Sequence, residues 1–145
     1  MTHSPLILGA DHAGFELKEL LKKHLQKQDV SFQDMTPLFR AGDDYPPIAQ
    51  KVARAVVKRK TLGLLICGSG FGMDIAANRI KGARAAIARN VKEVKLSRRD
   101  DLANILVLGA RLTNPVLATR ILSVWMTAPV GKAKRFVRRV KEMDV

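Results

Sequence analysis

The chain has 145 residues, of which 47% are hydrophobic and 27% are charged, the proportions of a soluble globular domain. No stretch reaches the roughly 18 consecutive apolar residues of a membrane-spanning helix, so we expect no membrane association. The 26 Lys and Arg against 13 Asp and Glu give a formal net charge of +13, which favours anionic ligands. Aromatic residues, at 5%, are too few for extensive base stacking, which argues against nucleic acid as the principal partner.

The N-terminal sequence and the cysteine content indicate the cellular compartment in which we expect the protein. Residues 1–8 lack the charged-then-apolar layout of a signal peptide. The single cysteine, Cys67, cannot form an internal disulfide, which fits a reducing compartment and leaves its thiol free for chemistry. We therefore expect a cytoplasmic protein, and its length predicts one domain over residues 1–145.

Short apolar runs alternate with amphipathic segments from one end of the chain to the other. Strands are predicted, in chain order, at 5–10, 30–32, 62–67, 83–87 and 104–108. Helical patterns are predicted at 17–25, 48–57, 75–77, 116–126 and 132–143. The alternation predicts an α/β fold with a doubly wound, Rossmann-like parallel sheet of about five strands and helices on both faces, in three layers.

Cys67 ends the predicted strand 62–67, which is a continuous apolar run of the kind found in strands covered on both faces. The glycine loop (residues 68–72) follows and opens a helix. Backbone N–H groups of such a turn can converge on an anion, and the N-terminus of a helix favours a thiolate, so we predict an acidic thiol here. The alternative is that Cys67 is a small buried hydrophobic residue beside a tight turn.

Other candidate residues lie at the end of the first predicted strand and in the last predicted helix. Asp11 and His12 follow strand 5–10 and should lie beside Cys67, because neighbouring parallel strands end at the same edge. His12 could bind phosphate, shuttle a proton or simply be a hydrogen-bonded structural residue. Arg135 and Arg139, four apart, share a helix face suited to phosphate. With one cysteine and no histidine pair at ligand spacing, we predict no metal site.

Six groups of residues occur in a characteristic order and spacing over nearly the whole chain. They are 9–14 (GADHAG), 44–46 (DYP), 67–72 (CGSGFG), 76–79 (AANR) with 82–85 (GARA), 104–106 (NIL) with 109–111 (GAR), and 132–135 (KAKR) with 138–140 (RRV). Together they resemble the type B ribose-5-phosphate isomerase and galactose-6-phosphate isomerase family.

The resemblance implies a homodimer with two sites at the subunit interface, no cofactor and no metal. It implies interconversion of an aldose phosphate with its ketose through an enediolate, and ribose 5-phosphate with ribulose 5-phosphate is the expected pair. Members of the family take the C2 proton either with a cysteine before the glycine loop or with a glutamate directly after it. Cys67 and Met73 occupy these positions, so Cys67 is the expected base.

The same resemblance assigns the remaining site residues. The expected anion-stabilising residues are Ser69 and the backbone of Gly68, Gly70 and Gly72. The expected phosphate-binding residues are His12, Arg111, Arg135 and Arg139. The residues expected to hold the sugar are Asp11, Tyr45 and Asn104.

Two positions depart from the family. A His-Asn-Asp run, whose histidine opens the furanose ring, aligns with residues 100–102 (DDL), and a histidine beside the phosphate aligns with Phe136. Asp100 is therefore a candidate catalytic residue that, when ionised, can only accept protons, and we expect slow turnover of cyclic ribose 5-phosphate. Two alternatives stay open: another pentose or hexose phosphate as substrate, and a non-catalytic sugar-phosphate or nucleic-acid binding module, which would have no need of the Cys67 thiol.

Overall fold

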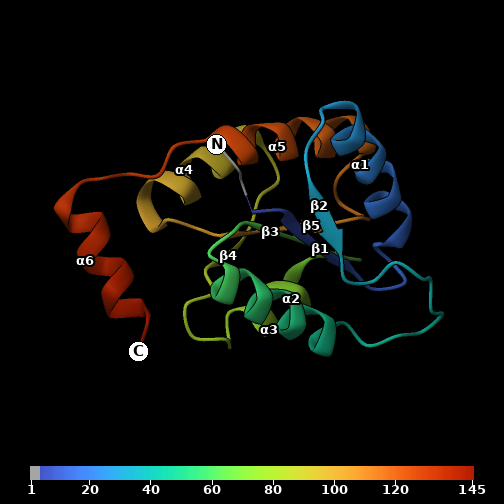
Figure 1. The fold of residues 1–145 in the computed structure, drawn as a ribbon, viewed down its shortest axis with the longest axis horizontal. Helices are drawn as coiled ribbons and strands as arrows, with labels where there is room; N and C mark the ends of the chain where they lie inside the picture. The colour runs from blue at the N-terminus through green and yellow to red at the C-terminus, as the bar shows by residue number, and fades with distance from the viewer. Residues whose placement is uncertain (1–3) are drawn as a thin grey trace.

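The computed structural model describes residues 4–145, and its strands form one five-stranded parallel sheet in the order β2-β1-β3-β5-β4 (Figure 1). The strands are β1 (Leu6–Ala10), β2 (Phe32–Asp34), β3 (Gly63–Cys67), β4 (Ala85–Ile87) and β5 (Ile105–Gly109). The predicted doubly wound α/β fold is confirmed, and the order of the strands reverses at β1 and β3, where such folds place their sites.

The helices form one layer on each face of the sheet, except the last. They are α1 (Phe15–Lys27), α2 (Tyr45–Arg59), α3 (Phe71–Ala77), α4 (Val91–Asp101), α5 (Pro115–Thr127) and α6 (Lys134–Met143). Helices α1, α4 and α5 pack on one face, and α2 and α3 pack on the other. Helix α6 extends from the body as an arm beyond α4 and carries the C-terminus (Figure 1).

The central strands bury side chains into two separate cores. In β3, Leu64 and Ile66 point into the core under α1, α4 and α5, whereas Leu65 and Cys67 point into the core under α2 and α3. Successive strand residues face opposite sides, so a strand covered on both sides is apolar at every position. This explains the continuous run at 62–67 and places Cys67 on the α2–α3 side.

The second strand lies two residues later than the sequence predicts. It runs over Phe32–Asp34 instead of 30–32, because the N–H of Val30 still donates to the carbonyl of Leu25 in α1, and pairing with β1 starts only at Leu6 and Phe32. Asp34 closes the strand although it is charged. The apolar pattern therefore did not extend the predicted strand to Asp34, whose charged side chain is 8% exposed and is paired with lysines.

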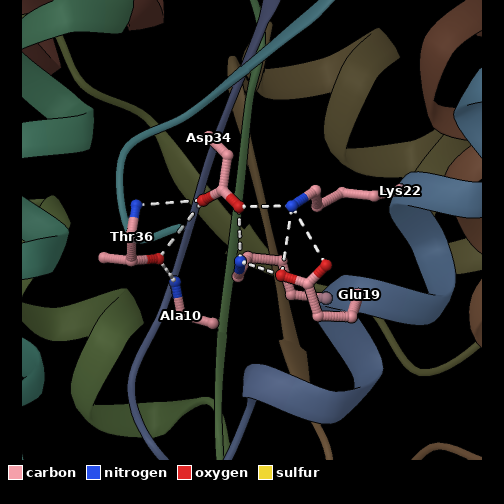
Figure 2. Close-up of polar contacts among 6 residues, drawn as sticks. Ala10, Glu19, Lys22, Asp34 and Thr36 are labelled. Atoms are coloured by element: carbon pink, nitrogen blue, oxygen red, sulfur yellow. Dashed lines mark hydrogen bonds and ion pairs between the residues drawn. The ribbon is translucent and has the colours of Figure 1, made fainter. Parts of the chain in front are cut away.

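Asp34 belongs to a polar cluster that joins β2 to α1 (Figure 2). The fully buried Lys18 places its Nζ 2.5 Å from Oδ2 of Asp34, and Nζ of Lys22 lies 2.9 Å from the same oxygen. Burial raises the pKa of Asp34, but hydrogen bonds from Lys18, Lys22 and Thr36 lower it by more in total, so its pKa lies below the ordinary value. Asp34 is therefore ionised at neutral pH, and the buried ammonium group of Lys18 has its counter-ion.

Asp74, in the first turn of α3, lacks such partners. Among residues 4–145, no group forms a hydrogen bond with its buried Oδ1. Burial raises the pKa of Asp74 from 3.8 to about 6. The folded state therefore holds this proton more tightly than the unfolded chain, and stability falls as pH rises from the unfolded pKa through the folded one.

Asp74→Asn keeps the shape of the side chain and removes its titration. We expect the variant to be more stable than the wild type at about pH 8 and to lose this advantage below about pH 4, where both states of the wild type are protonated. Urea unfolding at several pH values measures the difference. Glu16→Gln, which alters an exposed carboxylate on α1, is the control and should show no such trend. A variant that is less stable than the wild type at about pH 8 would contradict the prediction.

Candidate active site

The carboxyl ends of β1, β3 and β5 meet at one edge of the sheet. Ala10 pairs with Ile66, and Cys67 pairs with Gly109. Just beyond the strands, the backbone N–H of Asp11 donates to the carbonyl of Ile66 at 3.3 Å. These pairings bring the segments that follow three strands, separate in the sequence, to one place.

Cys67 and the glycine loop form the centre of this edge. The thiol is unpaired and only 5% exposed, and the backbone N–H of Gly70 donates to its Sγ at 3.1 Å. Gly70 has φ +88°, a conformation that favours glycine, and this turn directs the N–H back at the sulfur. A backbone donor aimed at Sγ suits a sulfur that carries negative charge during a reaction.

Two large side chains contact the glycine loop directly. A methyl group at Gly68 would lie 2.9 Å from Cζ of Arg111, so the guanidinium group rests on the loop backbone. The ring of Tyr45, the first residue of α2, fills the space that a side chain at Gly72 would need. Ser69 is half-buried in the loop, and its Oγ accepts the N–H of Phe71 at 3.4 Å.

Asp11 and His12 flank the loop from the end of β1. Asp11 is buried, and its Oδ1 accepts the N–H of Gly14 at 3.0 Å. His12 is exposed, and one oxygen of Asp43 lies 2.7 Å from its backbone nitrogen and 3.1 Å from its Nδ1. Asp43 was not predicted as a site residue, because an acidic residue in a loop carries no signal of a partner 31 positions away.

The remaining predicted residues form a second group around α4 and α6. Asp100, in the last turn of α4, accepts a hydrogen bond from Nε of Arg99 at 2.5 Å. That bond, with the nearby positive charges of Arg99, Arg135 and Arg139, holds the pKa of Asp100 below its ordinary value. Arg135 and Arg139, which lie on α6, are exposed. Asp100 is therefore a carboxylate at neutral pH, near the guanidinium groups of Arg135 and Arg139.

Within one chain the two groups lie at opposite edges of the sheet. Helix α4 ends, and β5 begins, at the amino edge, where the carbonyl of Asn104 accepts the N–H of Gly63. Asn104 itself uses its amide locally: its Oδ1 accepts the N–H of Arg84 at 2.8 Å, and its Nδ2 donates to the carbonyl of Gly82 at 3.0 Å. The structure therefore gives Asn104 a role in fixing a turn and does not bring it to Cys67.

Phe136 attaches the arm to the body. It is the buried residue of α6, and its ring lies against Gly131, whose N–H donates to the carbonyl of Arg99 at 3.0 Å. The guanidinium group of Arg135 stacks over the same ring at 4.5 Å. Phe136 therefore orients the arginine face of α6 while keeping the helix close to Asp100.

Neither a metal cluster nor a membrane span is found in the part of the chain that the structure describes. Residues 4–145 contain no group of three or more His, Cys, Asp or Glu side chains able to hold a metal ion. No helix over the same residues combines the length and the apolar character needed to cross a bilayer.

Comparisons with known proteins bear on the site. The sequence model of the Ribose/Galactose Isomerase family matches residues 6–143. Ribose-5-phosphate isomerase B of Mycobacterium tuberculosis is 37% identical over 142 residues, which cover 97% of this chain and 88% of the relative. The crystal structure of a ribose 5-phosphate isomerase from Thermotoga maritima has a TM-score of 0.93 at 35% identity and covers 99% of both chains. Ribose-5-phosphate isomerase B from Mycoplasma genitalium with bound ribulose-5-phosphate has a TM-score of 0.91 at 34% identity, covering 98% of this chain and 95% of that one. The chain therefore belongs to the ribose/galactose isomerase family.

Proposed function

We propose that this protein is a sugar-phosphate isomerase that interconverts ribose 5-phosphate and ribulose 5-phosphate. The observation that carries the proposal is the Cys67 sulfur, held under the N–H of Gly70 at the carboxyl edge of the sheet. Family membership supports it, and so does the Mycoplasma genitalium relative, whose structure is described with bound ribulose-5-phosphate, the product expected here.

In the proposed reaction, the thiolate of Cys67 takes the proton from C2 of the open-chain aldose. The electron pair of that C–H bond forms the C1=C2 double bond, and O1 becomes negative. Ser69 and the backbone N–H groups of the glycine loop stabilise this enediolate. Return of the proton to C1, with transfer of the O2 proton to O1, gives the ketose. A positioned base of this kind typically contributes a factor of about 10² to 10⁴ in rate.

The phosphate is proposed to bind to basic side chains from both groups of site residues. Arg111 and His12 lie at the carboxyl edge, and Arg135 and Arg139 lie on the arm. A guanidinium group can donate two parallel hydrogen bonds to two oxygens of one phosphate. Arg135 and Arg139, which share one face of α6, therefore suit this ligand. Asp11 and Tyr45 are left to hold the sugar hydroxyls beside the glycine loop.

We further propose a homodimer in which the arm of one copy completes the site of the other. Support comes from the separation of the two groups within one chain, since neither alone has both a base and the full set of arginines. Apolar side chains that stay exposed beside the loop, Phe71 (57%) and Ile75 (66%) on α3, would be covered by a second copy. A reduced, unpaired Cys67 fits our expectation of a cytoplasmic location.

Asp100 sets this chain apart from a typical member of the family. The hydrogen bond from Arg99 is the largest cause of its lowered pKa. Asp100 is therefore a proton acceptor at neutral pH. Ring opening needs a group that accepts the anomeric proton and a group that gives a proton to the ring oxygen. We therefore propose slow opening of cyclic ribose 5-phosphate. The same observation favours, as the second candidate, a different pentose or hexose phosphate as the preferred substrate, which a panel of sugar phosphates would identify.

Cys67→Ala should abolish isomerisation and leave the affinity for sugar phosphate within a few fold. The reason is that the thiolate acts in the transition state and contributes little to ground-state binding. Steady-state kinetics and a binding titration on the purified variant measure the two effects separately. If more than about a tenth of the wild-type rate remains, a barrier change below about 1.4 kcal/mol, Cys67 is not the base.

Mixing two inactive variants tests the composite site. One copy carries Cys67→Ala, and the other carries Arg135→Ala with Arg139→Ala. After unfolding and refolding together, half of the dimers are mixed and one of their two sites is intact, so about a quarter of the wild-type activity should return.

Each variant refolded alone is the control and should stay inactive. No recovery on mixing, in a sample that sedimentation shows to be dimeric, would place the whole site within a single chain.

Asp100→His should raise the rate with ribose 5-phosphate, because an imidazole can both accept and donate a proton near neutral pH. The rate from ribulose 5-phosphate, which cannot close to a furanose, should not rise. Initial rates in both directions give the comparison. Equal rates for the variant and the wild type in the aldose direction would show that this position does not limit turnover.

A further inference from the structure

The loop between β2 and α2 (residues 35–44) contacts the end of β1 at two points. Oγ1 of Thr36 accepts the backbone N–H of Ala10 at 3.0 Å. Oδ1 of Asp43 accepts the backbone N–H of His12 at 2.7 Å and lies 3.1 Å from its Nδ1. The two contacts lie on either side of Asp11. The loop therefore fixes the backbone at the end of β1, from Ala10 to His12.

The loop is itself anchored at its start. Oδ1 of Asp34 accepts the N–H of Thr36 at 2.9 Å and is 3.5 Å from its Oγ1. The other oxygen of Asp34 binds the ammonium groups of Lys18 and Lys22 (Figure 2). Lys18 is fully buried, so its partner carboxylate has little freedom to move. A continuous series of hydrogen bonds thus runs from the core of α1 through Asp34 and Thr36 to Ala10.

Two further features hold the other half of the loop. The ring of Phe39 packs edge-on against Phe15, the first residue of α1, with centroids 5.5 Å apart. Gly42, with φ +68°, turns the chain so that the N–H of Asp43 donates to the carbonyl of Arg40 at 3.3 Å. The carboxylate of Asp43 therefore approaches His12 from a loop that is held near its start by the Thr36 hydrogen bonds and at its middle by the Phe39 ring.

The contact with Asp43 also determines which ring nitrogen of His12 can act. An ionised carboxylate only accepts hydrogen bonds, so Nδ1 of His12 must carry a proton. Nε2 is then the nitrogen left for the substrate. In the neutral ring it accepts a hydroxyl proton, and in the charged ring it donates to a phosphate oxygen. Either role requires the ring orientation that Asp43 fixes.

We propose that Asp43 and Thr36 are positioning residues for His12, and that loop 35–44 acts as a two-point clamp on the end of β1. The clamp deepens the proposed function, since its effect on catalysis requires that His12 contact the sugar phosphate. The loop residues need not contact the substrate themselves.

Replacement of Asp43 tests the side-chain contact. Asp43→Ala should lower kcat/KM for ribose 5-phosphate roughly tenfold or more, because a hydrogen bond to a charged group is lost. Asp43→Asn should recover most of this loss, since its Oδ1 can accept both hydrogen bonds. Glu16→Ala, which removes an exposed carboxylate from α1, is the matched control and should stay near the wild-type value. A full loss in Asp43→Asn would overturn the positioning role.

A double-mutant cycle separates positioning from general damage to the loop. In a His12→Ala background, Asp43→Ala should lower kcat/KM much less than it does in the wild type, because only the hydrogen bond to the backbone N–H of residue 12 is then left to lose. An equal loss in both backgrounds would overturn the proposal.

Thr36→Val should lower kcat/KM and Thr36→Ser should not, since serine keeps the acceptor for the N–H of Ala10. Equal losses of kcat/KM in both variants would exclude the second contact of the clamp.

A spectroscopic measurement keeps the clamp testable apart from activity. Nitrogen chemical shifts of the His12 imidazole should show the Nδ1–H form in the neutral ring of the wild type and of Asp43→Asn, and a mixture of tautomers in Asp43→Ala. The Nε2–H form in the wild type would overturn the clamp even in an active enzyme. If the wild type isomerises no sugar phosphate, the proposed function fails, and this measurement still decides the clamp.

Discussion

Strands β1, β3 and β5 bury nearly all their side chains, because helices cover both faces of the sheet, and this constraint governs the rest of the molecule. A strand covered on both faces needs helices on both sides of the sheet, so each connection contains a helix that packs on one face and returns the chain in the same direction. All strands then end at one edge. The base, the glycine loop and the end of β1 meet there as a result of how the core is covered.

The polar groups divide between this edge and the opposite one. Helix C-termini carry negative potential and collect at the amino edge, where the guanidinium of Arg84 donates to the carbonyl of Leu102 and that of Arg98 donates to Ala103. Arg135 and Arg139 lie beyond this region, on an arm that Phe136 holds to the body. Part of the +13 charge therefore stabilises helix ends, and part stays available for an anion.

Features that depend on neighbouring residues were predictable from the sequence. The apolar run before Cys67 predicted a buried strand, and the glycines after it predicted the turn that carries the Gly70 N–H to the sulfur. Features that depend on distant polar partners were not. The burial of Asp34 follows from two lysines on α1, and the orientation of His12 follows from Asp43, and neither pairing leaves a periodic pattern.

The position of Asn104 shows what a motif does not specify. A motif gives residue types and spacing, but it does not say at which edge of the sheet a residue lies. Asn104 precedes β5, so it lies at the edge opposite to Cys67, and its amide satisfies the backbone of Gly82 and Arg84. The same topology separates Asp100 from the loop within one chain.

The burial of the single cysteine has a consequence for the chemical modification of the protein. With one thiol per chain, almost fully covered and at the end of a central strand, covalent cross-links between copies require local opening first. A bulky thiol reagent meets the same barrier. Its rate of reaction with Cys67 therefore reports how often the cover over this thiol opens, so the native residue serves as its own probe of local opening without an engineered label.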